Sequence, residues 1–137
     1  MSYSELCLVI DGEVIGAAER DSESVLNPST GETLAQLPHA TASDLDGALG
    51  AAKRAFGIWR DTAPIERGRV LRRGAALVRD RLDTIARTMT LEQGKPLAEA
   101  RGEILYACDV LDWYAEEGRR AYGRLIPAAS RNVRQMV

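Results

Sequence analysis

The sequence predicts an α/β fold in which short β-hairpins come first, about four helices follow and a terminal strand ends the chain. Short β-prone runs separated by turn residues predict the hairpins. From Thr41 onward, apolar residues recur at the 3.6-residue spacing of amphipathic helices. Residues 131–137 alternate polar and apolar side chains, which predicts a strand. Because no turn or partner strand is recognised for this run, we expect the natural protein to continue past Val137.

Two hairpins are expected in the first forty residues. Asp11 and Gly12 stand between two β-prone runs, and this pair favours a type I′ turn because both residues tolerate positive φ. The segment Asn27–Glu32 carries Pro, Ser and Gly in a pattern typical of a turn. Residues 17–24 are small and polar, which indicates a loop. The expected strands cover residues 6–10, 13–16, 25–26 and 33–37.

Thr41 is expected to cap the first helix, because Asp44 at the third helical position completes a capping box. Apolar residues then repeat on one face of this helix. These residues are Leu45, Ala48, Leu49, Ala52 and Phe56. Trp59 stands just past the expected end of the helix. A core position for its indole is favoured over a stacking role on a ligand.

Pro64 opens the second helix, since its missing N–H is not needed in the first turn. The apolar stripe consists of Leu71, Ala75, Val78 and Leu82. The other positions are rich in arginine: Arg67, Arg69, Arg72, Arg73, Arg79 and Arg81. Such a cluster would suit a phosphate or nucleic-acid face. A solvated face is favoured, because acids such as Glu66 and Asp80 balance the arginines and no aromatic residue is interleaved to stack bases.

A tight corner is expected to join a third helix, which Asp83 begins, to a long fourth helix. Gly94 favours a left-handed helix cap, and Pro96 suits the first turn of the next helix. The fourth helix is expected to run to Gly123. Gly102 and Gly118 lie inside it, and we expect each to mark the close approach of a neighbouring backbone. Its apolar face contains Leu97, Ile104, Leu111 and Ala115.

Composition narrows the class of protein. The chain has 137 residues, which is enough for one domain or a piece of a larger one. A net charge of −2 argues against nucleic-acid binding, and no apolar run approaches the roughly 20 residues of a membrane helix. Glu5 interrupts any signal-peptide pattern, so we expect a cytoplasmic protein.

The residues alone predict no catalytic, cofactor-binding or clustered metal site. Cys7 and Cys108 have no metal or redox spacing, and Asp109 would raise rather than lower the pKa of the Cys108 thiol. Cys7 is interpreted as a small strand hydrophobe. His39 could act as a base or metal ligand, but a solvated loop position is favoured because no partner stands near it in the sequence.

Several short motifs, in this order and spacing, resemble the N-terminal quarter to third of the NAD(P)-dependent aldehyde dehydrogenase superfamily. They are Ile10–Glu13, Asn27–Glu32, Ala51-Ala52 with Ala55-Phe56 and Trp59, Pro64 with Glu66-Arg67, Thr90–Pro96, Gly102-Glu103, and Tyr122-Gly123 with Ile126-Pro127. Thr90–Pro96 and Trp113–Glu117 look most similar to the succinate-semialdehyde dehydrogenase branch.

This resemblance implies a helical N-terminal part of a Rossmann-like cofactor domain over residues 1–130 and the start of an oligomerisation strand over 131–137. It implies a homo-oligomer that oxidises an aldehyde, here succinate semialdehyde, to a carboxylic acid with NAD or NADP. In the family a cysteine thiolate attacks the aldehyde and a glutamate-activated water releases the acid. These groups and the catalytic domain would lie beyond Val137, so we expect this chain alone to be inactive and to hold no cofactor.

Three residues match functional positions of the family, although a purely structural role is favoured for each. Tyr106 and Trp113 match a helix that lines the substrate tunnel. Glu92 matches an acidic position near a monovalent-cation site. A non-catalytic helical binding or assembly module remains the alternative, because the terminal strand could add to the edge of a partner's sheet.

Overall fold

The computed structural model describes residues 3–18 and 20–137, and within them the elements follow the expected order. Strands β1 (Leu8–Ile10) and β2 (Glu13–Ile15) form one antiparallel hairpin, and β3 (Ser22–Leu26) and β4 (Thr33–Pro38) form another. The helices are α1 (Ala42–Asp61), α2 (Pro64–Asp80), α3 (Leu82–Gln93) and α4 (Leu97–Glu117). Strands β5 (Leu125–Ile126) and β6 (Gln135–Met136) follow. The α/β class, with hairpins ahead of the helices, is confirmed.

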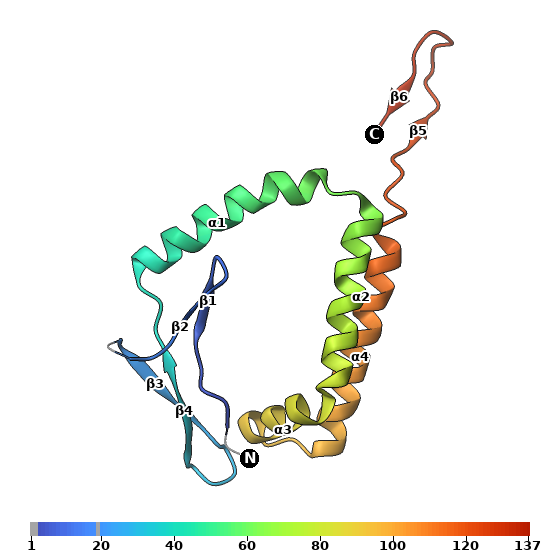
Figure 1. Cartoon of the computed structure of the whole chain (residues 1–137). Helices are drawn as coiled ribbons and strands as arrows, with labels where there is room; N and C mark the ends of the chain where they lie inside the picture. Colours follow the sequence, from blue (N-terminus) through green and yellow to red (C-terminus); the bar gives the residue numbers. More distant parts are fainter. Residues whose placement is uncertain (1–2, 19) are drawn as a thin grey trace.

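The elements form an open arc (Figure 1). Helices α2 and α4 lie side by side along their length, and α3 packs across the base of this pair. Helix α1 extends from the far end of α2 toward the two N-terminal hairpins, and its contacts are chiefly with β1. The β5–β6 hairpin projects away from the end of α4. The α2–α4 pair is therefore the centre of the packed part of the chain.

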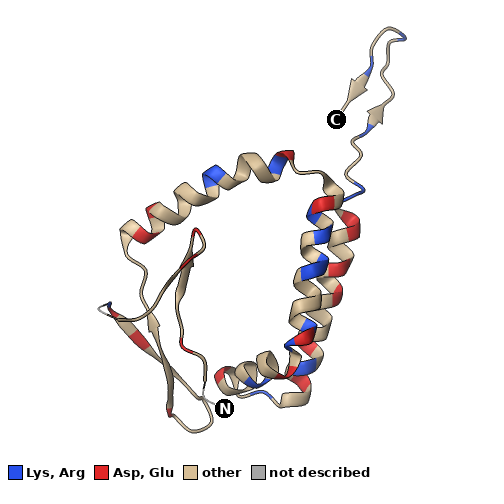
Figure 2. Cartoon of the chain, in the orientation of Figure 1, with Lys and Arg blue, Asp and Glu red and all other residues tan. Residues whose placement is uncertain are grey.

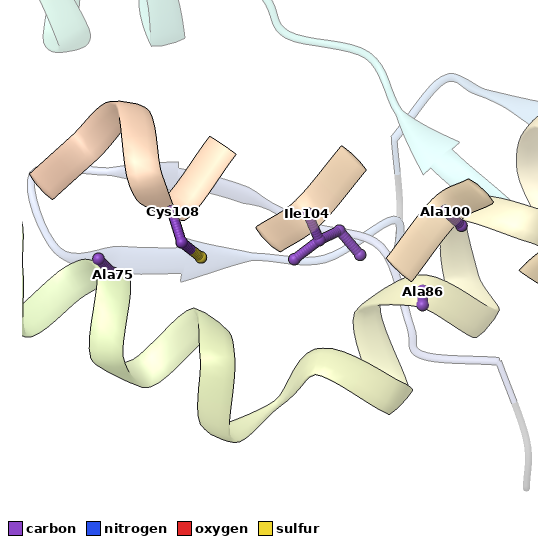
Figure 3. Close-up of a cluster of buried hydrophobic side chains, with 5 residues drawn as sticks. All are labelled: Ala75, Ala86, Ala100, Ile104 and Cys108. Carbon is purple, nitrogen blue, oxygen red and sulfur yellow. The ribbon is translucent and has the colours of Figure 1, made fainter. Parts of the chain in front are cut away.

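Small side chains form the core between α2, α3 and α4 (Figure 3). Ala75 of α2 and Ala86 of α3 meet Ala100, Ile104 and Cys108 of α4, and all five are buried. Alanines at the contact allow the helix axes to approach closely, because the approach distance depends on the side chains between them.

Gly68 of α2 lies at a close approach of the two helix backbones. A Cβ atom at this position would lie 2.7 Å from the carbonyl oxygen of Ala115 in α4. The sequence placed such an approach at Gly102 and Gly118 instead, and this prediction is wrong. A Cβ at Gly102 would meet nothing within 4 Å, and one at Gly118 would meet only Tyr114 of its own helix. The spacing of glycines along one helix does not show which of them faces a partner.

Ion pairs join the exposed flanks of α2 and α4 (Figure 2). Arg79 Nη2 lies 2.9 Å from Asp109 Oδ1 and 2.8 Å from Asp112 Oδ2, and Arg72 pairs with Glu116. The interpretation of these arginines as a solvated, acid-balanced face is consistent with this arrangement, although most of their partners come from α4 rather than α2.

The start of α1 has the capping box that the sequence predicts. The Thr41 hydroxyl accepts from the Asp44 amide at 3.2 Å, and Asp44 Oδ2 accepts from the Thr41 amide at 2.8 Å. Arg20, in the loop before β3, also donates to both Asp44 carboxylate oxygens, at 2.6 and 3.2 Å. This ion pair holds the pKa of Asp44 well below its usual range, and the Thr41 hydrogen bonds lower it further.

Helix α1 continues past Trp59, and none of its residues is buried. The expected apolar face is present, but Leu45, Leu49 and Phe56 are exposed on it. Trp59 lies inside the helix and is exposed as well, so the predictions of an earlier helix end and of a core position for the indole are wrong for this chain. The periodicity of the sequence identifies the apolar face of α1 correctly. Whether that face is buried depends on which other elements pack against it.

Two tight turns adopt the backbone conformations that the sequence predicts. In the β1–β2 turn, Asp11 and Gly12 have φ values of 52° and 85°, the positive pair that a type I′ turn requires. Gly94 ends α3 in the left-handed conformation with φ 72°, and Pro96 directly precedes α4. The expected corner between α3 and α4 is confirmed.

The C-terminal part differs from the expectation in two ways. Helix α4 ends at Glu117, with Gly118 as its cap, and does not reach Gly123. The terminal strand is shorter than expected and does have a partner: Leu125 pairs with Met136, and Ile126 with Gln135. The run Leu125–Ile126 is too short to be recognised as a strand from β-propensity alone.

Candidate functional site

The outer face of α4 presents two exposed aromatic residues. Tyr106 is 71% exposed and Trp113 is 66% exposed. They are seven residues apart, which is close to two helical turns, so both lie on the same side of α4. The buried stripe of α4, with Ile104 and Cys108, faces α2 and α3 instead. The two aromatic side chains are therefore free to line a surface that another element or a ligand contacts.

Glu92 lies near the C-terminal end of α3, apart from this aromatic face. Its carboxylate accepts a hydrogen bond from the Tyr3 hydroxyl. Desolvation, with the hydrogen bond to Glu92 and its charge, raises the pKa of Tyr3 to about 12. Among the described residues, no group of three or more His, Cys, Asp or Glu side chains is placed to hold a metal ion. Glu92 is therefore not part of such a group of side chains.

A cleft along α3 was not expected from the sequence. It has a volume of about 610 Å³ and lies between residues 3–4 and one side of the helix. The lining residues are Tyr3, Ser4, Thr84, Arg87, Thr88, Thr90, Leu91 and Leu97. Tyr106 and Trp113 are not among them, so the cleft and the aromatic face of α4 are separate features. The periodicity of α3 alone could not predict the cleft, because Tyr3 and Ser4 are distant from α3 in the sequence.

The cysteines and the histidine do not form a catalytic group. Cys108 is fully buried in the α2–α4 core, where a substrate could not reach its Sγ. Cys7 is exposed and directly precedes β1, so its interpretation as a small hydrophobic residue within the strand is wrong. His39 is half-exposed, with Nε2 3.8 Å from Glu23 Oε2, in agreement with the expected solvated position.

The described residues do not fit a nicotinamide dinucleotide by themselves. Such cofactors bind where a glycine-rich turn leads from a strand into a helix N-terminus. The strand-to-helix junction here, between β4 and α1, runs from Pro38 to Thr41 without a glycine.

Within the described part of the chain, no helix is long and apolar enough to cross a membrane.

Comparison with known proteins places the chain in a family. The sequence profile of the aldehyde dehydrogenase family matches residues 15–137. The NADP(+) succinate-semialdehyde dehydrogenase GabD of Escherichia coli is 43% identical over 129 residues, covering 94% of this chain and 27% of that protein. The 4-(hydroxymethyl)benzenesulfonate dehydrogenase TsaD1 of Comamonas testosteroni is 47% identical over 130 residues, covering 95% of this chain and 27% of that protein.

The fold agrees with this similarity. The structure of a succinate-semialdehyde dehydrogenase from Burkholderia pseudomallei superposes with a TM-score of 0.89 at 40% identity, covering 96% of this chain and 27% of that one. The chain belongs to the aldehyde dehydrogenase family. It spans about a quarter of the length of the curated relatives it matches.

Proposed function

We propose that this chain is the N-terminal portion of an NAD(P)-dependent enzyme that oxidises an aldehyde to a carboxylic acid. The observation that carries the proposal is the similarity to GabD over 94% of this chain. In this proposal, residues 1–130 form the helical part of a cofactor domain and residues 131–137 begin an oligomerisation strand of a cytoplasmic homo-oligomer. When bound, the nicotinamide accepts a hydride. The residues that hold it would lie outside this chain.

The proposed substrate is an aldehyde with an anionic group at its far end, and succinate semialdehyde is the preferred candidate. The names of two relatives specify a succinate semialdehyde and a sulfonate, each of which bears such a group. The outer face of α4 would contribute Tyr106 and Trp113 to the wall of the substrate tunnel. Both side chains are exposed on one side of a helix whose other side is fixed by the core. Glu92 would supply one carboxylate ligand to a monovalent-cation site.

The substrate assignment is tested on the longer protein that carries this segment. We expect kcat/KM for succinate semialdehyde to exceed that for acetaldehyde. Equal values, or a preference for acetaldehyde, would refute the proposed substrate and leave the family assignment intact. The same assay with NAD and with NADP determines the preferred cofactor.

The role of the aromatic face is tested by substitution of Tyr106. Tyr106→Ala should lower kcat/KM for succinate semialdehyde by roughly tenfold, as the loss of about 1.4 kcal/mol of transition-state binding would do. Tyr114→Ala is the matched control, because Tyr114 is an exposed tyrosine on another side of α4. If the two substitutions lower kcat/KM equally, the proposed tunnel role of Tyr106 is wrong.

An assembly module is the second candidate, and the exposed apolar face of α1 favours it. The two candidates differ in the coding sequence after Val137. A continuation with a strand and a Trp-Asn-Phe-Pro-like segment supports the enzyme, whereas an immediate stop codon supports the module.

A further inference from the structure

We infer that Arg79 of α2 is a specificity-determining residue for an anionic aldehyde, because its positive charge compensates the carboxylate of Asp109 on the aromatic face of α4. This role depends on the proposed function, in which Tyr106 and Trp113 form part of the wall of the substrate tunnel. A carboxylate beside that wall repels a negatively charged substrate unless a cation compensates it.

Asp109 lies beside both aromatic residues of α4. It follows Tyr106 by three residues and precedes Trp113 by four, and residues at these spacings are neighbours on a helix surface. The side chain of Asp109 is 75% exposed, so its carboxylate stands at the surface. An aldehyde that contacts Tyr106 and Trp113 would therefore pass close to this negative charge.

Arg79 reaches the carboxylate from the neighbouring helix. Its Nη2 atom lies 2.9 Å from Asp109 Oδ1 and 2.8 Å from Asp112 Oδ2, so one guanidinium serves two acids. The buried contact of Ala75 with Cys108 keeps α2 beside α4 at this height. Hydrogen bonds to Asp112 and Asp109 raise the pKa of the Arg79 guanidinium, so the compensating charge is permanent.

The compensation of Asp109 depends on a single residue. Among the residues that the structure describes, Arg79 is the only cation paired with Asp109. The acidic residue one turn before Tyr106 has a cation of its own, since Glu103 pairs with Lys95. Loss of the Arg79 charge would therefore leave a carboxylate uncompensated between the two aromatic residues.

Arg79→Gln in the longer protein removes the charge and keeps a hydrogen-bond donor for the two acids. It should raise KM for succinate semialdehyde about threefold, because like charges repel over distances up to about 10 Å at 0.1 M salt. KM for butanal, which has the same carbon chain without the carboxylate, should not change. A displaced α4 would affect both aldehydes, so the ratio of the two KM values separates the charge of Arg79 from a structural role.

Three further measurements test whether charge is responsible. Arg79→Lys keeps the positive charge and should retain most of the wild-type selectivity. Asp109→Asn, added to Arg79→Gln, removes the uncompensated carboxylate and should restore KM for succinate semialdehyde. The difference between Arg79→Gln and the wild type should also shrink in about 1 M salt, where the screening length is only about 3 Å.

Arg101→Gln is the matched control. Arg101 of α4 pairs with Asp83 of α3, so its substitution also removes one cation and one ion pair between helices. Arg101 lies five residues before Tyr106 and therefore on another side of α4. This substitution should leave both KM values unchanged.

The role of Arg79 is refuted if Arg79→Gln raises KM for butanal as much as for succinate semialdehyde, if Arg101→Gln changes the ratio equally, or if Asp109→Asn restores nothing. The wild type tests the proposed function separately. If it oxidises neither aldehyde, the proposed function and the role of Arg79 both fail. If it oxidises succinate semialdehyde and Arg79→Gln leaves the KM ratio unchanged, only the role of Arg79 fails.

Discussion

Gly68 sets how closely α2 approaches α4. An added methyl group would lie 2.7 Å from the Ala115 carbonyl, and both atoms are held by helical backbone, so the helices must move apart. We expect Gly68→Ala to lower the free energy of unfolding by about 1–3 kcal/mol. Gly74→Ala on the same helix meets nothing within 4 Å and should raise it by up to about 1 kcal/mol. Urea denaturation would measure both, and a stabilising Gly68→Ala would contradict the close approach.

Asp44 should make the stability of α1 depend on pH. Its folded pKa is lowered by Arg20 and by Thr41, so its contribution is complete above the unfolded pKa of about 4 and is lost as the pH falls toward the folded value. The destabilisation caused by Asp44→Asn should therefore be largest near neutral pH and shrink below about pH 4. Thermal denaturation across this range tests the prediction. Asp80→Asn is the control, because this exposed carboxylate makes no ion pair within the described residues, and a similar pH trend there would contradict it.

Substitutions on the buried side of α4 should lower the free energy of unfolding much more than substitutions on its exposed side. Ile104 is 4% exposed in the core, whereas its neighbour Leu105 is 41% exposed. Ile104→Ala should cost about 2–5 kcal/mol of unfolding free energy, because it leaves a cavity. Leu105→Ala should cost about 0.5 kcal/mol or less, as is usual for surface substitutions. Equal costs in chemical denaturation would mean that α4 packs differently from the arrangement described.

Sequence rules that involve only neighbouring residues correctly predicted the turns and helix caps that depend on neighbouring residues. The Asp11-Gly12 turn, the Thr41 capping box and the Gly94 cap each depend on residues within a few positions, and the structure contains all three. The exposed Trp59 and the close approach at Gly68 depend on which distant elements pack together, so periodicity could not predict them. The same applies to the candidate site.

The aromatic residues of α4 could be selected from the sequence only through the family resemblance. Helical spacing shows that Tyr106 and Trp113 share a face, but it does not show what that face contacts. The contact between Tyr3 and Glu92 joins residues 89 positions apart and had no local signal.

The whole chain leaves extensive apolar surface exposed. Leu49, Phe56 and Ile58 of α1 are exposed, as are Leu125 and Met136 of the terminal hairpin. Apolar patches beyond a few hundred Å² usually lead to association. We expect the isolated chain to form an oligomer or larger assembly in light scattering, and Phe56→Lys to reduce the mass. Asp46→Lys, which also places a lysine on α1 but reverses an existing charge and removes no apolar surface, should reduce it less. A monodisperse monomer with cooperative unfolding would contradict this expectation, because it would show that the exposed apolar surface does not recruit a partner.

In our proposal this chain supplies one wall of the substrate tunnel of an aldehyde dehydrogenase but not its reaction centre. The measurement that tests this compares the chain with the longer protein and follows the formation of reduced cofactor with succinate semialdehyde and NAD or NADP. We predict sustained turnover by the longer protein and none by the chain alone, because Cys108 is buried and the described residues form no cofactor site. Sustained turnover by the chain alone, abolished by Cys108→Ala, would contradict the claim.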